Sequence, residues 1–350
     1  MNDYPAHLEA MWQKHLAPRE PNAPTVISTF AGAGGSSLGY SMAGYHELLA
    51  VEWDNNAVET FRLNFPDVPV YHGDIAKLSV DECLRMAGIQ PGELDVFDGS
   101  PPCQGFSTAG KRIMDDPRNQ LFREYVRLLR GLRPKVFVME NVSGMVKGKM
   151  KLVFVEILKE LKASGYHVSA KLLNAMWFNV PQSRERMIFI GVRDDLGIEP
   201  THPKKGGRLV TVREAISNIS APIEASAWMD GYAVGKEWDG LALGKKSGRY
   251  RSLIKPSLDR PCPTLTKDCH TNHAASVTHP FERRKFSSYE SKALASFPLM
   301  FSYVGGYIAF GERIGNSVPP LFMEAIARHI RQEILSHVHQ PILEDTGQYG

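Results

Sequence analysis

The sequence contains few cysteines and no long apolar run. Only four of its 350 residues are cysteine, at positions 83, 103, 262 and 269, and they lack the paired spacing of secreted disulfide frameworks. No stretch approaches the roughly 20 apolar residues of a membrane span, and residues 1–4 do not resemble a signal peptide. We therefore exclude a membrane protein and a secreted disulfide scaffold, and expect a cytoplasmic protein with no membrane partner.

A standard metal-binding motif is also missing. Cys262, Cys269, His270 and His273 lie near one another in the sequence, but their spacing matches no common zinc site. We interpret them as ordinary loop residues and predict no metal.

Neither sign of charge is in large excess, since the net charge is +3. The distribution is uneven, because residues 201–290 hold 15 lysines and arginines against 9 aspartates and glutamates. Two basic runs, at 245–251 and 283–285, lie in this segment, and glycine and tyrosine interrupt the first. Such a segment suits contact with nucleic-acid phosphates, although a modestly basic surface also occurs in proteins that bind no nucleic acid.

The motif that indicates chemistry most directly is Pro-Pro-Cys-Gln-Gly-Phe-Ser at 101–107. Residues 94–98 predict a short buried strand, which Gly99 and the two prolines end. Cys103 is therefore expected at the carboxyl edge of a sheet, where open α/β sheets bind ligands. A cysteine held there is a candidate nucleophile, and the alternative is a small hydrophobic residue buried in the core.

A glycine-rich turn, Phe-Ala-Gly-Ala-Gly-Gly-Ser-Ser at 30–37, follows a predicted strand at 25–29. Its glycines let backbone N–H groups approach a ligand closely. We expect a helix from Leu38 onward, whose positive end suits a carboxylate or phosphate. Position 37 is serine instead of the third glycine of the dinucleotide fingerprint, which disfavours a nicotinamide cofactor.

Two further predicted strand ends carry carboxylates. Glu52 is placed where a carboxylate can accept both hydroxyls of a ribose, and its neighbour Trp53 can stack on a purine. Asp74 closes a third strand and can accept a hydrogen bond from an adenine amino group. For each carboxylate the alternative is a helix cap or a surface charge. Together these residues favour an adenosine with a small charged tail, and S-adenosylmethionine over NAD.

A strand predicted at 135–139 brings Glu140 to the same edge as Cys103. A partly desolvated carboxyl group there is suited to donating a proton near neutral pH. The block Gln-Ser-Arg-Glu-Arg at 182–186 precedes another predicted strand at 187–192. In an extended chain Arg184 and Arg186 point the same way, which suits carbonyl oxygens or phosphates. A solvated entry to the strand is the usual alternative.

Eight blocks resemble, in the same order, those of the DNA cytosine methyltransferases of bacterial or phage type, which modify carbon 5. They are Phe-Ala-Gly-x-Gly-Gly at 30–35, Glu-Trp-Asp at 52–54, Gly-Asp-Ile at 73–75, Pro-Pro-Cys-Gln-Gly-Phe-Ser at 101–107, Glu-Asn-Val at 140–142, Gln-Ser-Arg-Glu-Arg at 182–186, Arg-Pro-x-Pro-Thr at 260–264 and Gly-Asn-Ser-Val-Pro-Pro at 315–320. They cover the chain from residue 25 to residue 330. Ser28 departs from the pattern, because the family usually has an aspartate there.

The resemblance implies a mechanism and a set of site residues. Cys103 would add as a thiolate to carbon 6 of cytosine, Glu140 would support protonation of ring nitrogen 3, and Arg184 and Arg186 would hold O2 and order the site. Carbon 5 would then take the methyl group of S-adenosylmethionine, with the base flipped out of the duplex. The implied cofactor contacts are Phe30, Gly32, Gly34, Gly35, Glu52, Trp53, Asp74, Ile75, Pro102, Leu121 and Asn316.

The resemblance also implies an α/β fold. A Rossmann-like S-adenosylmethionine-dependent methyltransferase domain would occupy residues 25–193, completed by 305–335, and a smaller irregular target-recognition domain residues 194–304. The expected partners are double-stranded DNA and, functionally, a restriction endonuclease, and we expect a monomer at the nucleoid of a prokaryotic cell. The alternatives are a tRNA cytosine-5 methyltransferase on the same scaffold, a non-enzymatic binding protein, and an unrelated nicotinamide oxidoreductase.

Overall fold

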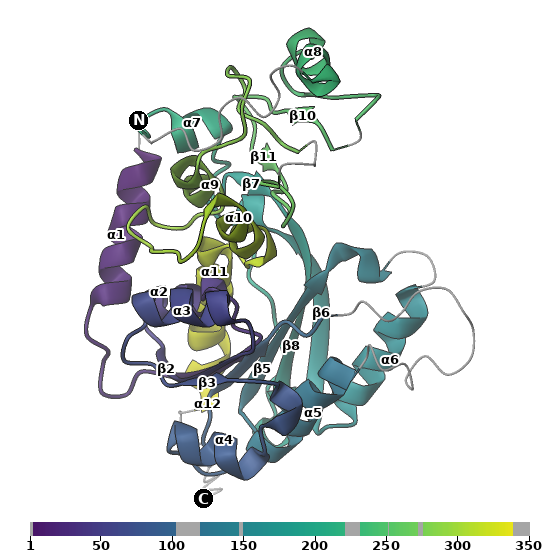
Figure 1. The fold of residues 1–350 in the computed structure, drawn as a ribbon. Helices are drawn as coiled ribbons and strands as arrows, with labels where there is room; N and C mark the ends of the chain where they lie inside the picture. The colour runs from purple at the N-terminus through teal and green to yellow at the C-terminus, as the bar shows by residue number, and fades with distance from the viewer. Residues whose placement is uncertain are drawn as a thin grey trace, which may run out of the picture.

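The computed structural model describes residues 3–102, 120–146, 150–220, 232–250, 252–271 and 276–338. Seven strands form one sheet with helices on both faces, and a smaller lobe of short elements lies at one end of it (Figure 1). The predicted α/β class is therefore confirmed. Cys103 lies outside the described residues.

The sheet contains β1 (Thr25–Thr29), β2 (His46–Glu52), β3 (Val70–His72), β4 (Val96–Gly99), β5 (Val136–Val142), β6 (Tyr166–Asn174) and β8 (Glu185–Arg193). The other strands are β7 (Gln182–Ser183), β9 (Lys245–Lys246), β10 (Ile254–Lys255) and β11 (Cys262–Pro263). The helices are α1 (Tyr4–Leu16), α2 (Gly35–Met42), α3 (Asn55–Asn64), α4 (Val80–Ala87), α5 (Gln120–Leu132), α6 (Met150–Lys162), α7 (Val212–Ile216), α8 (Ala233–Gly240), α9 (Ser288–Leu294), α10 (Tyr307–Asn316), α11 (Pro320–Ile330) and α12 (Ser336–Val338).

The strand order is β3-β2-β1-β4-β5-β8-β6. The first five strands pair in parallel, and β8 runs antiparallel to both of its neighbours. In parallel sheets the carboxyl ends of the strands meet at one edge, where ligands bind. The loops after β1, β2, β4 and β5 therefore come together.

Two hydrophobic cores cover the two faces of the sheet. Val26 and Ile27 of β1 are both fully buried, and they belong to opposite cores because successive strand residues point to opposite faces. One core contains residues of α1, α2 and α11, and the other contains residues of α4, α5 and α6. Burial on both faces explains the nearly continuous apolar runs of the central strands.

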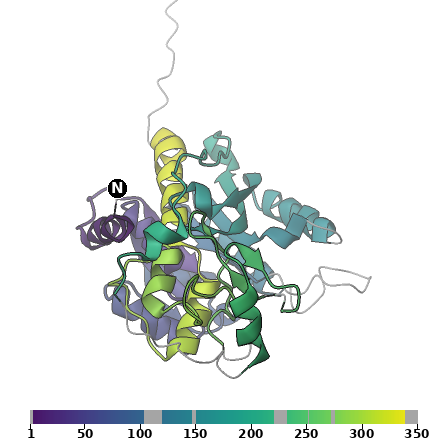
Figure 2. The ribbon, with the colours of Figure 1, turned by 90° about the horizontal axis from the view of Figure 1, so that it is seen from above.

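The C-terminal part of the chain returns to the large lobe. The Tyr45 hydroxyl donates to the Ala327 carbonyl oxygen of α11 at 2.9 Å, and the Asn64 side-chain amide donates to the Ser302 carbonyl at 2.9 Å. Figure 2 shows α11, in yellow, between α1 and the teal strands. The returning chain thus packs on α2 through α11 and hydrogen-bonds to α3 through residue 302.

The smaller lobe holds α7, α8 and the short strands β9 to β11. The short helix α7 has a side-chain cap, since Thr211 and Glu214 form a capping box at its start. Trp238 and Leu253 are the buried residues of a small separate core in this lobe. Other apolar residues of this lobe, such as Val212 and Leu258, belong instead to the large core that also contains residues of α1, α2 and α11.

Burial of His15 predicts a loss of stability in acid. Its Nε2 donates to the Asn64 carbonyl oxygen and its Nδ1 accepts from the Ser41 hydroxyl, to which Arg19 also donates. Burial lowers the pKa of His15 to about 4, whereas histidine in an unfolded chain titrates near pH 6.5. Between pH 6.5 and pH 4 the native state therefore binds fewer protons than the unfolded chain. The contribution of neutral, buried His15 to the free energy of unfolding is fully present above pH 6.5 and is lost as the pH falls toward 4.

Urea denaturation at pH 7 and pH 5 measures this effect. Between pH 7 and pH 5, the free energy of unfolding of the wild type should fall by about 2 kcal/mol more than that of His15→Gln. His46→Gln, which changes an exposed histidine, should keep the wild-type difference. An unchanged difference in His15→Gln would show that His15 does not carry this pH dependence.

Candidate active site

A cavity of about 430 Å³ lies at the carboxyl edge of the sheet. Its lining comes from the ends of β1, β2, β4 and β5, from the start of β8 and from the end of α10. Of the residues predicted for the site, the lining includes Phe30, Gly32, Gly35, Glu52, Trp53, Pro102, Glu140, Arg184, Arg186 and Asn316. Segments more than 280 residues apart in the chain therefore share one cavity, as the sequence predicts for a ligand site.

The glycine-rich turn enters this cavity with unusual backbone geometry. Gly32 and Gly34 have φ values of 56° and 93°, which glycine adopts without strain. Phe30, with a φ of 55°, adopts a conformation that is uncommon for a residue with a side chain. The helix α2 begins at Gly35, three residues before the predicted start, because Gly34 in the left-handed region serves as its N-cap. A Cβ on Gly35 would lie 2.4 Å from the Val318 carbonyl oxygen, so this position requires glycine.

Gly34 itself does not line the cavity. It provides the turn, and a Cβ there would lie 2.5 Å from the Phe65 ring. Its contribution to a ligand site is therefore to the backbone conformation of the loop.

Glu52 holds the loop together. It is 8% exposed, and its carboxylate accepts from the backbone N–H groups of Gly32 at 2.7 Å, Trp53 at 2.8 Å and Asp54 at 3.0 Å. A carboxylate has about four acceptor sites. Glu52 can therefore accept a further hydrogen bond from a ligand while it keeps the turn and the end of β2 in place.

An apolar slot of about 360 Å³ continues from Phe30 and Glu52 toward β3. The ring of Trp53, 76% exposed, lines it, and the Asp74 carboxylate accepts from the Ala76 N–H at 3.0 Å. The remaining lining residues are Val51, Gly73, Ile75, Pro102 and Leu121. A slot with an exposed aromatic ring and carboxylates at its rim suits a flat, polar-edged group such as a purine.

Glu140 and Arg186 form an ion pair on adjacent strands. Glu140, on β5, is 9% exposed, and the Arg186 Nε donates to its Oε1 at 2.5 Å. The strand β5 continues beyond Glu140 to Val142, which pairs with Arg186 in register. The pair therefore places one carboxyl group and one guanidinium side by side near the carboxyl end of β5.

Arg184 has a different environment from Arg186. It is 2% exposed, and its two terminal nitrogens donate to the carbonyl oxygens of Leu265 at 3.1 Å and Gly315 at 2.9 Å. Burial lowers its pKa to about 9, so it is charged at neutral pH. Arg184 thus ties the small lobe and α10 to the start of β8, and both of its terminal nitrogens are already engaged.

Sequence reasoning did not single out Asn141. Its side-chain amide donates to the Pro101 carbonyl oxygen at 3.1 Å, and its Oδ1 accepts from the Val142 N–H at 2.9 Å. Asn141 therefore holds the two prolines that precede Cys103 against the end of β5. Its place in the Glu-Asn-Val block was the available signal.

A buried carboxyl group at Asp98 was also missed. Asp98 is 2% exposed, pairs in register with Ser28 on the neighbouring strand, and accepts a hydrogen bond from the Tyr40 hydroxyl at 3.2 Å. Burial is the main cause that raises its pKa to about 8. A carboxyl group is therefore present beside Ser28, on β4 instead of β1, and it contacts Tyr40 of α2.

No cluster of three potential metal ligands occurs in the described ranges. Cys262, Cys269 and His270 are buried, and the Cys269 sulfur contacts the His270 Nδ1 at 2.7 Å. Across the same ranges, no helix has the length and apolar character needed to cross a membrane.

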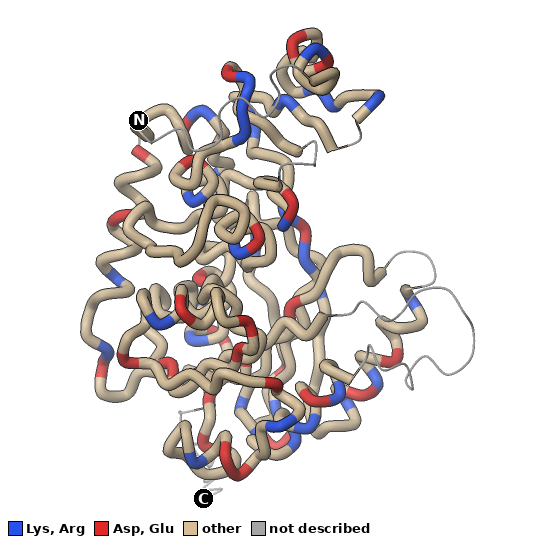
Figure 3. The backbone as a smooth tube through the Cα atoms, in the orientation of Figure 1, with Lys and Arg blue, Asp and Glu red and all other residues tan. Residues whose placement is uncertain are grey.

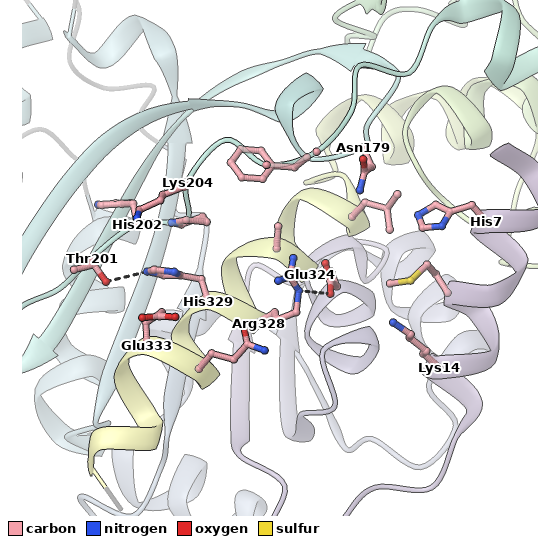
Figure 4. A pocket seen from close by; sticks show the side chains of 18 residues that line it. His7, Lys14, Asn179, Thr201, His202, Lys204, Glu324, Arg328, His329 and Glu333 are labelled. Carbon is pink, nitrogen blue, oxygen red and sulfur yellow. Dashed lines mark hydrogen bonds and ion pairs between the residues drawn. The ribbon is translucent and has the colours of Figure 1, made fainter. Parts of the chain in front are cut away.

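A larger groove, of about 710 Å³, lies between α1, α11 and residues 201–207. Figure 4 shows His7, His202 and His329 around it, with the Thr201 hydroxyl bonded to the His329 Nε2 at 2.9 Å. None of the residues predicted for the site lines this groove. The predicted residues gather at the sheet edge instead.

Comparison with known proteins identifies the family. Residues 24–332 match the family described as C-5 cytosine-specific DNA methylase. Type II methyltransferase M1.HphI of Haemophilus parahaemolyticus is 37% identical over 330 residues, which cover 87% of this chain and 86% of the relative. Type II methyltransferase M.DdeI of Desulfomicrobium norvegicum is 32% identical, with 87% and 88% covered.

Solved structures agree in fold. A structure described as a DNA modification methyltransferase encoded within a prophage of E. coli has a TM-score of 0.75 and 25% identity, and the match covers 90% of this chain and all of that one. The Dnmt2 methyltransferase of S. pombe shares the fold, with a TM-score of 0.64, 20% identity, and 91% and 100% covered. The chain therefore belongs to the C-5 cytosine-specific DNA methylase family, enzymes that take their methyl group from S-adenosylmethionine.

Proposed function

We propose that this enzyme methylates a cytosine flipped out of a specific duplex DNA sequence, through a covalent bond between Cys103 and carbon 6 of the base. The observation that carries the proposal is the Glu140–Arg186 pair, which lines the same cavity as the two prolines preceding Cys103 and the glycine-rich turn. This arrangement brings a carboxyl group, a cation and the two prolines that precede Cys103 to one sheet edge. A base inside a stacked duplex cannot reach such an edge, so it must leave the stack.

Each residue has a distinct part in this chemistry. The Cys103 thiolate forms a bond to carbon 6, and the Glu140 carboxyl group donates a proton to ring nitrogen 3. The electron pair of the former double bond between carbons 5 and 6 then makes carbon 5 nucleophilic. S-adenosylmethionine supplies an electrophilic methyl group. A water molecule then takes the proton from carbon 5, the bond between sulfur and carbon 6 breaks as the double bond between carbons 5 and 6 re-forms, and ring nitrogen 3 returns its proton to Glu140, so that both the Cys103 thiolate and the Glu140 carboxyl group are restored. Arg186 orients Glu140 and faces the base O2, while Arg184 acts as a positioning residue.

We assign the apolar slot to the adenosine of the cofactor. Trp53 would stack on the purine, Asp74 would accept from its amino group and Glu52 from a ribose hydroxyl. The methionine end would then lie along the glycine-rich turn, between Gly32 and Asn316. The methyl group would then lie in the cavity that Glu140 also lines.

The cofactor assignment predicts a large effect of Trp53. Trp53→Ala should weaken binding of S-adenosylhomocysteine by about tenfold or more, because stacking of a base on an aromatic ring is worth about 1–3 kcal/mol. Isothermal titration calorimetry measures the Kd. Leu63→Ala, which removes another exposed apolar side chain, should leave the Kd unchanged. Equal affinities for Trp53→Ala and the wild type would place the adenosine elsewhere.

A trapping experiment tests the proposed covalent step. Duplex DNA with 5-fluorodeoxycytidine in place of deoxycytidine retains fluorine where the departing proton should be, so the adduct cannot eliminate. Incubation with S-adenosylmethionine should give a complex that survives denaturation, and mass spectrometry of its peptides should place the DNA on Cys103. Turnover without such a complex would contradict the mechanism.

Several features of the biological setting are part of the same proposal. The relatives named above are Type II methyltransferases, which supports duplex DNA over tRNA as substrate and a pairing with a restriction endonuclease. We infer that the enzyme acts as a monomer, since one chain supplies all eight blocks of the family pattern, and that it acts at the nucleoid of a prokaryotic cell. We also assign residues 25–193 and 305–335 to catalysis and residues 194–304 to target recognition.

A further inference from the structure

The strands β9 and β10 form a two-stranded antiparallel ribbon in the small lobe. Lys246 pairs with Ile254 and Lys245 with Lys255, and the Ser247 N–H donates to the Leu253 carbonyl at 2.9 Å, which continues the pairing toward the tip. Leu253 is fully buried and packs with Trp238 of α8. The ribbon is therefore anchored on one side and projects from the lobe at its tip.

Ser247 holds residues 247–250, the first part of the turn at the tip of the ribbon, together. Ser247 is 5% exposed, and its hydroxyl oxygen accepts from the backbone N–H groups of Arg249 at 3.1 Å and Tyr250 at 2.9 Å. The same hydroxyl donates to the Glu237 carboxylate at 2.6 Å. This small network orders the turn before any partner binds, which lowers the entropic cost of a contact made by the turn.

The described residues at and beside the tip include exposed cations. Lys245, Lys246 and Arg249 are exposed, and among the described residues none of them forms an ion pair. The guanidinium of Arg249 lies over the ring of Tyr250, 5.4 Å from its centroid, and this cation–π contact positions the head group at the tip. Figure 3 shows lysine and arginine positions along this upper lobe.

The lobe that carries the ribbon is joined directly to the rim of the active site. The strand β7 pairs with β11, and the residue after β7 is Arg184, which lines the cavity and bonds to Leu265 and Gly315. The ribbon lies on the far side of this junction from the sheet (Figure 1). A duplex whose target base enters the cavity would therefore pass beneath the small lobe.

We propose that the β9–β10 ribbon enters the major groove of the target duplex and that Arg249 reads a guanine of the recognition sequence. The major groove admits a two-stranded ribbon, and two parallel hydrogen bonds from an arginine to guanine O6 and N7 are the commonest specific contact there. Lys245 and Lys246, behind the tip, contact phosphates on either side and carry no sequence information. This inference rests on the proposed action on duplex DNA.

The test compares sequence preference, not activity alone. The wild-type enzyme methylates a library of duplexes with randomised sequence, and sequencing that detects 5-methylcytosine gives its preference at each position. Arg249→Ala should lose its preference for guanine at one position by about 10- to 100-fold in kcat/KM and keep the other preferences. Arg213→Ala, which removes another exposed arginine of the small lobe, should keep the wild-type preference throughout.

A modified base locates the contact. 7-Deazaguanine at the affected position removes N7, so it should slow the wild type and leave Arg249→Ala unchanged. Lys246→Ala should instead slow methylation of all sequences alike and make it less dependent on salt.

Two results would overturn the inference. In the first, Arg249→Ala keeps the sequence preference of the wild type at every position and methylates at the wild-type rate. In the second, Arg249→Ala keeps every preference but methylates all sequences more slowly, which would make Arg249 a phosphate contact. A wild-type enzyme that methylates no duplex DNA would instead refute the proposed function on which the inference rests.

Discussion

Replacing Cys103 by alanine should abolish methyl transfer, with a loss in kcat of roughly 10⁴-fold or more. Alanine lacks the sulfur that adds to carbon 6, and without that addition carbon 5 of the pyrimidine is too weak a nucleophile to attack the methyl group. Binding of S-adenosylhomocysteine and of duplex DNA should stay within about twofold of the wild type, because the substitution removes one atom and no charge that either ligand requires. Transfer of a labelled methyl group to DNA and titration of both ligands measure these quantities.

The control for this prediction is another cysteine. Cys83→Ala changes a buried residue of α4, in the core below the sheet, and should keep its activity under conditions where it is folded. The trapping experiment also distinguishes the two variants, since only Cys103→Ala should fail to form the fluorocytosine complex. Residual turnover of Cys103→Ala above about one per cent of the wild type would rule out an obligatory covalent step.

Glutamine in place of Glu140 should lower kcat by about 10²- to 10⁴-fold, the range that a positioned proton donor contributes. Glutamine has the same shape and still accepts a hydrogen bond from Arg186, but it cannot give up a proton to ring nitrogen 3. The removal of the carboxylate also leaves Arg186 without its ion-pair partner at 2.5 Å. The KM for S-adenosylmethionine should change little, because the adenosine slot does not include Glu140.

Single-turnover kinetics distinguishes this role from a structural one. In Glu140→Gln, formation of the covalent complex with fluorocytosine DNA should slow in parallel with methyl transfer, while the free energy of unfolding stays near the wild-type value. Glu59→Gln, which removes an exposed carboxylate on α3, should match the wild type in all three measurements. Turnover of Glu140→Gln within tenfold of the wild type would assign the proton to another group.

Much of the sheet could be predicted from local patterns. The strand predicted at 25–29 is β1 with the same bounds, because an apolar run between proline and a glycine-rich turn permits little else. The start of α2 was predicted at Leu38 and lies at Gly35. Gly34 adopts a left-handed conformation that caps the helix earlier, and the sequence does not reveal which glycine of the turn takes it.

Long-range contacts explain what local patterns could not predict. The two arginines of the 182–186 block look equivalent in sequence, yet Arg184 bonds to carbonyl groups 81 and 131 residues away, whereas Arg186 pairs with Glu140. Asp98 belongs to a predicted strand, and its hydrogen-bond partner, the Tyr40 hydroxyl, comes from α2, 58 residues away. The catalytic assignments themselves remain predictions, and for Cys103 they rest on the sequence, since it lies outside the described residues.

The most direct test of the central claim is the identity of the methylated nucleoside. The enzyme is incubated with S-adenosylmethionine that carries a labelled methyl group and with either duplex DNA of mixed sequence or bulk tRNA, and the products are digested to nucleosides. We predict that the label appears in 5-methyldeoxycytidine from the duplex. Label only in 5-methylcytidine from the tRNA, or in no nucleoside of either substrate, would contradict the assignment of duplex DNA as the substrate.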